Sequence, residues 1–297
     1  MNTLTGVLVG GASVGCVYAL LAAAYALIFK ASHTLNLALG GLLLIGGYTA
    51  FQFGPGGNGL PFWVATLIAV VVVGVVGWLV QLGVARPLIA ARPDALIIAT
   101  VGIDLAIRAA LGVRDTWALN RAEVGSPWTS PVRIAGASVA VSDLWIVGIT
   151  VVLLGALGAA VVGTRWGLTM RACAADLEAA RAQGISTTRN LTIVWVIAAV
   201  LAGVAGVLVG TYPRTLDLSN FTWALRALPA VVIGGMGSLR GAIVGGLIVG
   251  YAEALMAAFQ PAALGGNFQL VFPFVVMFAV LLLRPQGLFG RPEVARI

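Results

Sequence analysis

The chain has 297 residues, of which 60% are hydrophobic and only 9% are charged, and its net charge is +7 at pH 7. Because charged residues make up about 25% of an ordinary soluble domain, this chain cannot cover a water-facing surface, which excludes a soluble globular protein. Several apolar stretches reach the ~20 residues that cross a bilayer as a helix. The composition therefore predicts an all-α polytopic membrane protein in which residues 1–297 form one transmembrane domain.

The positive charge does not indicate nucleic-acid binding, because the basic residues are spread between apolar segments rather than gathered in one patch. In a membrane protein, an excess of Lys and Arg more often sets the topology. The two cysteines, Cys16 and Cys173, and the single histidine, His33, indicate neither a disulfide framework nor a metal site. The first residues lack the basic region of a secretory signal peptide, so we expect them to belong to the first span.

The first half of the chain contains four apolar segments, and the spans expected from them cover residues 4–29, 37–53, 62–85 and 95–111. The linker 54–61 is rich in glycine and proline, which predicts a tight loop. After the fourth span, residues 112–142 are polar and are expected to form an external loop. Within it, the alternating segments 132–134 and 138–141 predict a small β-hairpin.

The second half begins with Asp143, which is predicted to cap the next span. Further spans are expected at residues 144–163, 191–211, 242–259 and 268–283. The segment 221–235 is short for a span and carries Arg226 and Pro229. If the polar segment 164–190 is cytoplasmic, 11 of the 17 basic residues lie on the inside, which favours an external N-terminus and an internal C-terminus. That orientation needs an odd number of crossings, so we expect 221–235 to cross, which gives nine. The expected total is about eight to nine, because the segment adds no crossing if it only dips into the membrane and returns.

Most of the 39 glycines lie inside apolar segments. Small residues allow helix backbones to approach closely in lipid, so glycine-rich packing of the spans is expected. Residues 40–48 and 245–251 look alike and lie in opposite halves of the chain, which suggests an internal repeat. Convergent packing by small residues explains the likeness at least as well, and we favour it.

The segment 164–190 differs from the rest of the chain because it is polar and contains six charged residues: Arg165, Arg171, Asp176, Glu178, Arg181 and Arg189. Residues 170–183 are good helix formers and Gly184 is a helix stop, so we expect one short exposed helix. Such a loop between spans is where a membrane protein meets a soluble partner. The alternative is a solvated helix in which Glu178 pairs with Arg181, worth only a few tenths of a kcal/mol.

The sequence Glu-Ala-Ala at 178–180, followed after three residues by Gly184, resembles the cytoplasmic loop motif of the permease subunits of bacterial ABC importers. Along most of the chain, and in the same order, the sequence more specifically resembles the branched-chain amino-acid permeases of the LivH type. The stretches that carry it are 15–20, 35–41, 167–185, 228–241 and 284–290. The chain departs from the family at Leu37, where an aromatic residue is usual, and at Leu39, where a polar residue is usual, which leaves urea and short amides open as substrates.

The resemblance implies a coupling helix that docks into a groove of an ATPase, with Arg171, Glu178, Ala179, Ala180 and Gly184 as the coupling residues. It also implies a location in the bacterial inner membrane. The implied partners are a second homologous permease subunit, two ATP-binding subunits, a periplasmic substrate-binding protein and membrane lipid. The chain contains no Gly-x-x-x-x-Gly-Lys-Ser/Thr loop, and its one lysine is Lys30. We therefore expect no ATPase site, metal or cofactor on this subunit.

Ionisable residues inside membrane spans are candidates for function, because a charge at mid-bilayer costs ~2.5–3.5 kcal/mol. Asp104 and Arg108 are four residues apart on one helix and are expected to neutralise each other, and Glu253 is expected to reach the interface. Backbone carbonyls at interruptions of a transmembrane helix can line a path through the membrane. On that basis the candidate residues of the translocation pathway are Asn36, Gly40, Gly41, Gly234, Gly235 and Gly237, although both stretches also look like ordinary helix ends.

Two other classes of function are alternatives for this sequence. An intramembrane enzyme needs a nucleophile with a base, or metal ligands, at membrane depth, and one histidine near a span end makes this improbable. A secondary carrier or channel is the nearer rival, although a proton-coupled or sodium-coupled carrier is expected to show more ionisable residues inside its spans.

Overall fold

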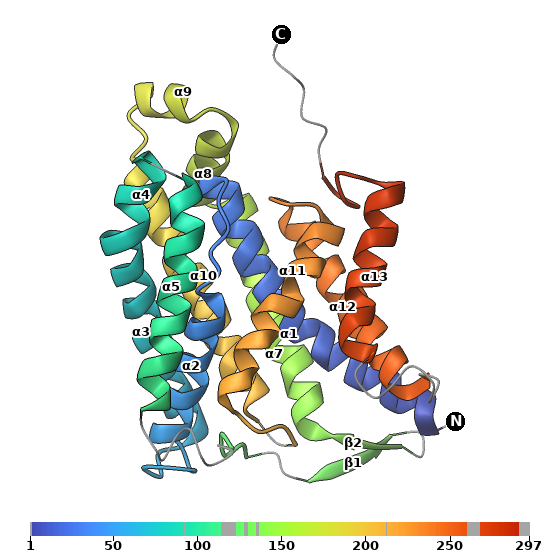
Figure 1. Ribbon diagram of the computed structural model, residues 1–297. Helices are drawn as coiled ribbons and strands as arrows, with labels where there is room; N and C mark the ends of the chain where they lie inside the picture. Colours follow the sequence, from blue (N-terminus) through green and yellow to red (C-terminus); the bar gives the residue numbers. More distant parts are fainter. Residues whose placement is uncertain are drawn as a thin grey trace.

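The computed structural model describes residues 2–91, 93–113, 123–127, 130–134, 137–211, 213–259 and 268–290. They form a helical bundle with one small hairpin (Figure 1). The longer helices are α1 (Asn2–Ser32), α3 (Phe62–Val80), α5 (Pro93–Gly112), α7 (Val141–Gly163), α10 (Thr187–Val209) and α12 (Leu239–Phe259). The shorter ones are α2 (Leu39–Phe53), α4 (Arg86–Ala91), α8 (Arg165–Ala175), α9 (Leu177–Ala182), α11 (Thr222–Gly234) and α13 (Phe268–Leu283), with a π-helical turn η1 (Gln81–Ala85) and a 3-10 turn η2 (Leu218–Phe221).

Six helices in the described part of the chain are long and apolar enough to cross a bilayer, which confirms a polytopic α-helical membrane protein. They cover Gly6–Ser32, Phe62–Ile89, Asp94–Gly112, Val141–Gly163, Thr187–Val209 and Leu239–Phe259. The helices α2, α11 and α13 have 15, 13 and 16 residues and are shorter than a typical span. The total of eight to nine crossings therefore stays a prediction.

Helix α11 runs along the bundle from the hairpin end toward the end that carries α9, and α12 runs back (Figure 1). The segment 221–235 thus passes along the bundle rather than dipping in and returning. The start of α1 lies near the hairpin end, whereas the turn after α13 lies at the opposite end (Figure 1). The two ends of the described chain therefore lie at opposite ends of the bundle, as an odd number of passes requires.

Helix α1 is the central element of the bundle. Its residues from Cys16 to Ile28 are buried on every side, and they pack against α7, α10, α11 and α12. In a membrane, an apolar helix can face lipid as well as protein, so hydrophobicity alone does not place α1 in the core. Its small residues, such as Gly15 and Ala19, let neighbouring backbones approach closely, which suits it to the central position.

Glycines make the closest helix contacts. A Cβ atom at Gly246 of α12 would lie 2.5 Å from the Cα of Ala19 in α1, and one at Gly250 would overlap the backbone of Gly15. Gly46 of α2 meets the backbone of Gly203 in α10 in the same manner. The two glycine segments that look alike in sequence, 40–48 and 245–251, therefore both serve close packing, as a repeat and convergent packing both require.

The predicted hairpin is confirmed. Strands β1 (Pro131–Ile134) and β2 (Ala137–Ala140) pair antiparallel, with Ile134 opposite Ala137. The prediction for Asp143 is wrong: α7 already begins at Val141, and its N-cap residue Ala140 has no side-chain capping hydrogen bond. Asp143 instead forms an ion pair with Arg214, at 3.0 Å between Oδ1 and Nη2, because a cation from another part of the chain is within reach.

Candidate functional site

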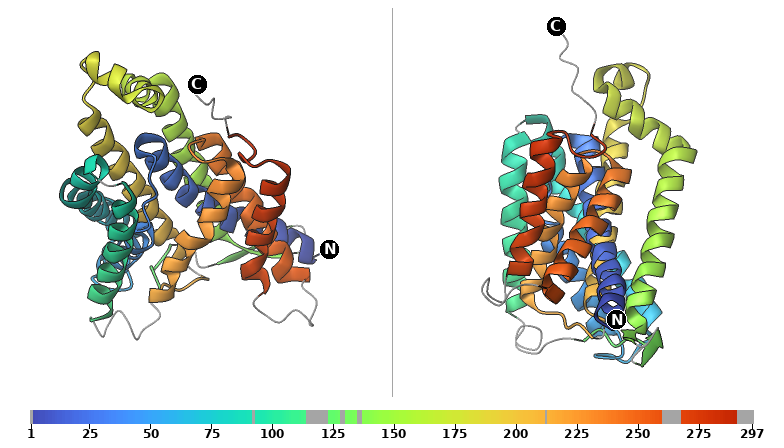
Figure 2. Two further views of the ribbon diagram at one scale, coloured as in Figure 1. Left: turned by 45° about the horizontal axis from the view of Figure 1, so that its top comes forward. Right: turned by 90° about the vertical axis from the view of Figure 1, so that its right-hand side faces the viewer.

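The segment between α7 and α10 projects beyond the ends of the neighbouring helices (Figure 2). The prediction of one helix over residues 170–183 is wrong, because the segment forms two helices, α8 and α9, that meet at Asp176. Asp176 has an extended backbone with φ −154°, and its Oδ1 accepts hydrogen bonds from the N–H groups of Glu178 and Ala179, both at 3.0 Å. By capping α9 in this way, Asp176 favours an extended backbone at its own position over a continuation of α8. Such a cap stabilises a helix by about 1 kcal/mol.

The predicted stop at Gly184 is confirmed. Gly184 has φ +76°, a left-handed conformation that side chains other than glycine adopt at a cost. Its N–H donates to the carbonyl of Arg181 at 2.9 Å, and the N–H of Ile185 donates to the carbonyl of Ala180 at 3.0 Å. These two bonds form a Schellman motif. Helix α9 is therefore short, but it is closed at both ends by hydrogen bonds.

The predicted coupling residues lie in three different settings. Glu178, Ala179 and Gly184 are exposed on α9 and the turn that follows it. Ala180 is only 4% exposed, so it faces the protein. Arg171 lies on α8, and its guanidinium donates a hydrogen bond to the carbonyl of Val161 in the last turn of α7. An arginine favours this position because the last carbonyls of a helix are unpaired and carry partial negative charge.

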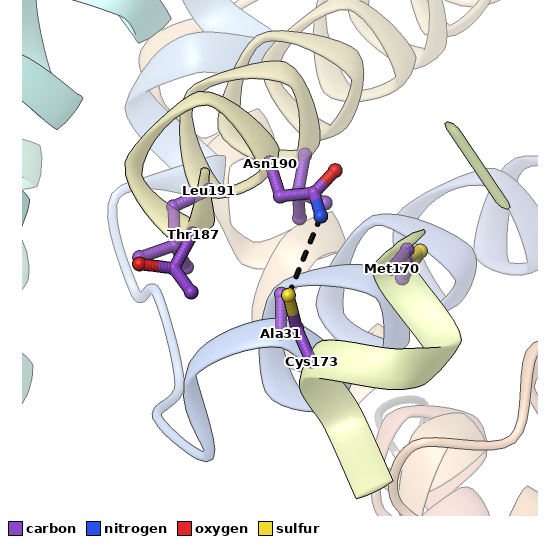
Figure 3. Close-up of a pocket in the computed structure, with 7 residues that line it drawn as sticks. Ala31, Met170, Cys173, Thr187, Asn190 and Leu191 are labelled. Carbon is purple, nitrogen blue, oxygen red and sulfur yellow. Dashed lines mark hydrogen bonds between the residues drawn. The ribbon is translucent and has the colours of Figure 1, made fainter. Parts of the chain in front are cut away.

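Helix α8 is seated on α10 and on the end of α1. Asn190 is buried, and its Nδ2 donates to the Sγ of Cys173 at 3.4 Å (Figure 3). The hydroxyl of Thr169 donates to the Oδ1 of Asn190 at 3.2 Å. Ala31 of α1 borders the same small pocket (Figure 3). A groove of about 580 Å³, which shares Asn190 with this pocket, opens toward the start of α10 and is bordered by Arg165, Gly184 and Arg189.

These contacts connect the exposed helix α9 to three spans. Side-chain hydrogen bonds join α8 to α7 through Arg171 and to α10 through Asn190, and α8 also packs against α1. Among the described residues, the ion pairs are Asp104–Arg108, Asp143–Arg214 and Glu253–Arg226. The pairing of Glu178 with Arg181 that the sequence offered as an alternative is not among them. The charged groups of α9 are therefore available to a partner.

The ion pair expected between Asp104 and Arg108 is confirmed, at 2.9 Å between Oδ2 and Nε. The guanidinium of Arg108 also lies 3.8 Å from the centre of the Phe221 ring. A Cβ atom added to Gly40 would lie 3.1 Å from Oδ1 of Asp104, so the carboxylate lies against the first turn of α2. Negative charge is stabilised there by the unpaired N–H groups of the helix start.

The carboxylate of Glu253 has two partners inside the bundle, and its reach to the membrane interface stays a prediction. The hydroxyl of Tyr18 donates to its Oε2 at 2.5 Å, and Nη1 of Arg226 lies 3.6 Å from its Oε1. Sequence analysis missed this cluster of Tyr18, Arg226 and Glu253 although one signal was present. Arg226 stands in an apolar segment and needs an acidic partner, and few acidic residues lie within apolar segments of this chain.

The candidate pathway residues lie in two separate places. Asn36 is buried, and its Oδ1 accepts a hydrogen bond from the N–H of Ala38 at 3.0 Å, just before α2 begins next to Gly40 and Gly41. The stretch Gly234, Gly235 and Gly237 ends α11, where the N–H of Phe289 donates to the carbonyl of Gly234 at 3.0 Å. Both stretches are helix ends, and the structure does not bring them together.

The chain is similar to known membrane permeases along most of its length. The family described as "Branched-chain amino acid transport system / permease component" matches residues 7–281. The chain is 31% identical to the high-affinity branched-chain amino acid transport system permease protein LivH of Salmonella typhimurium, over 97% of this chain and 96% of that protein. It is also 27% identical to the permease protein LivM of the same-named system in that organism, over 95% of this chain and 70% of LivM.

Among solved structures, PsaBC from Streptococcus pneumoniae in complex with Fab is similar, with a TM-score of 0.53 over 96% of each chain. The sequence identity is 13%, so this likeness concerns the fold alone. The match of the family over residues 7–281, and the likeness to LivH along almost the full length of both proteins, are decisive. This chain belongs to the family of permease components of branched-chain amino acid transport systems.

Proposed function

We propose that this chain is the membrane-spanning permease subunit of an ATP-driven importer for branched-chain or other hydrophobic amino acids. The observation that carries the proposal is the exposed helix α9, closed at both ends by hydrogen bonds and attached through α8 to the spans. Membership of the permease family supports it. The substrate follows the name of the relative LivH, with which this chain shares nearly its whole length.

The mechanism we propose is mechanical. ATP-binding subunits grip α9 through Glu178, Ala179 and Gly184, and their closure moves α8 and α9 as one rigid body. Because Arg171 fixes α8 to α7 and Asn190 fixes it to α10, that motion reaches both spans. The groove beside Arg165 and Arg189 would receive acidic side chains of the same partner, because unlike charges attract across an interface.

The proposed assembly lies at the inner membrane. It pairs this chain with a second homologous permease subunit, two ATP-binding subunits and a periplasmic substrate-binding protein. The second permease is suggested by the names LivH and LivM, which are two permease proteins of one same-named transport system in Salmonella typhimurium. In this arrangement α8 and α9 face the cytoplasm and the β-hairpin faces the outside. The translocation pathway runs past the buried breaks near Asn36 and Gly40 and past the end of α11 at Gly234.

The source of energy tests this function against a secondary carrier. In cells that express the whole system, uptake of labelled leucine should stop when ATP is depleted and should continue when a proton uncoupler is added at preserved ATP. Without the ATP-binding subunits, uptake should fall to background. Uptake that survives ATP depletion and follows the proton gradient would assign the chain to a secondary carrier instead.

A further inference from the structure

Three helices contribute polar side chains to one cluster inside the bundle. Tyr18 of α1 donates a hydrogen bond to Oε2 of Glu253 in α12, and Nη1 of Arg226 in α11 lies 3.6 Å from Oε1 of the same carboxylate. The ring of Tyr18 packs against that of Trp223, with the centroids 5.3 Å apart. Arg226 lies in the second turn of α11, close to the end of the bundle that carries the hairpin (Figure 1).

The charges of this cluster cannot face lipid. The side chain of Arg226 is 23% exposed and that of Glu253 is 15% exposed in the isolated subunit. Charged groups in spans face the bundle interior, a water-filled cavity or another protein, because exposure to hydrocarbon is costly. The exposed part of this cluster therefore faces an aqueous path or the surface between permease subunits.

The pair of Arg226 and Glu253 is the loosest of the three ion pairs in the described part of the chain. The other two have distances of 2.9 and 3.0 Å, whereas 3.6 Å is longer than an N–H···O hydrogen bond. Arginine carries five N–H donors in a planar fork that fits a carboxylate with two parallel bonds. Arg226 thus has donors to offer, and Oε1 of Glu253 is an acceptor beside it.

An α-amino acid carries a carboxylate and an ammonium group on one carbon atom, and this pair of side chains has the complementary charges. The 3.6 Å gap is too narrow to hold a ligand, so the contact between α11 and α12 is closed in this structure. Entry of a zwitterion would replace one loose ion pair by two charge-assisted contacts, without adding net charge to the membrane interior. We propose that Arg226 binds the α-carboxylate, and Glu253 the α-ammonium group, of the amino acid in transit. This inference rests on the proposed function.

The test uses the complete transporter in proteoliposomes with leucine-loaded binding protein. The double variant Arg226→Gln/Glu253→Gln removes both charges, so it leaves no unpaired charge in the membrane. We expect its maximal rate of leucine uptake to fall about tenfold or more, since hydrogen bonds to charged groups contribute about 1.5–3 kcal/mol. The concentration of loaded binding protein that gives half the maximal rate should not change, because that protein docks outside the membrane.

The matched control is Asp143→Asn/Arg214→Gln, which removes a pair of almost equal side-chain exposure, 14% and 22%. Its uptake should stay within about twofold of wild type, because the change removes both charges together and leaves no unpaired charge behind. The charge-swapped variant Arg226→Glu/Glu253→Arg restores a pair between α11 and α12 in reverse. It should stay inactive, because a reversed zwitterion points its side chain the wrong way.

Wild-type uptake in the Arg226→Gln/Glu253→Gln variant would overturn the inference, and so would restored uptake in the swapped variant, which would show that the pair only ties two helices together. If the wild-type complex itself takes up no leucine, the proposed function fails, and this inference fails with it. The two failures are distinguishable because the first appears in the variants and the second in the wild type.

Discussion

A transporter that carries Gly184→Arg should take up leucine about 30-fold more slowly than wild type, while its spans keep their helical circular-dichroism signal. Gly184 has φ +76°, and a Cβ atom there would have no neighbour within 4 Å. The substitution therefore strains only the end of α9, by about 1–2 kcal/mol, and leaves the bundle untouched. In the docked complex, however, its long side chain must fit where the partner packs against Gly184, and overpacking of this kind costs about 1–3 kcal/mol.

The control for this prediction is Gly184→Asn, because asparagine adopts the left-handed conformation more readily than most residues and adds no charge. Its uptake should stay within about threefold of wild type. Comparing the two variants at equal amounts of protein in the membrane separates a docking defect from a folding defect. Normal uptake by the arginine variant would contradict the coupling role of α9.

A single methyl group between α1 and α12 should have the largest effect on stability. In Gly250→Ala, the new Cβ would overlap the backbone of Gly15 and lie 2.8 Å from the carbonyl oxygen of Gly11. No side-chain rotation relieves a clash with backbone, so α12 must move away from the central helix α1. Overpacking of this kind costs about 3 kcal/mol, which corresponds to a fall of about 6–12 °C in the thermal unfolding midpoint.

Gly155→Ala in α7 is the matched control, since a Cβ atom there has no neighbour within 4 Å. It should leave the midpoint unchanged or raise it, because alanine favours a helix over glycine by up to about 1 kcal/mol. Both midpoints can be measured on the detergent-purified chain by the loss of helical circular dichroism. Equal midpoints for the two variants would show that the contact between α1 and α12 is not tightly packed.

Features that depend on residues close together in the sequence were predictable from it. Apolar length predicted the spans, alternation in 132–134 predicted β1, and Gly184 predicted the end of α9. Asp176 shows the limit of such reasoning. It stands among good helix formers, and its capping of Glu178 and Ala179 prevails over propensity, which contributes only a few tenths of a kcal/mol per residue.

Contacts between distant segments were not predictable in the same way. The wrong expectation for Asp143 and the missed partner of Glu253 have one cause, because each carboxylate pairs with an arginine more than 25 positions away, Arg214 and Arg226. A sequence shows that a charge in a span needs a partner, but it does not show which helix supplies it. Glycine spacing likewise indicated close packing of α12 without identifying α1 as the neighbour.

The most direct test of the central claim is the side of the membrane on which α9 lies. Ala179 is exposed and Val132 in β1 is exposed at the opposite end of the bundle, so each can be changed to cysteine after Cys16→Ala and Cys173→Ser. With a membrane-impermeant maleimide, the cysteine at 179 should react only in inverted vesicles, and less when the ATP-binding subunits are bound. The cysteine at 132 should react only in intact cells. Reaction of the cysteine at 179 from outside intact cells would contradict the account.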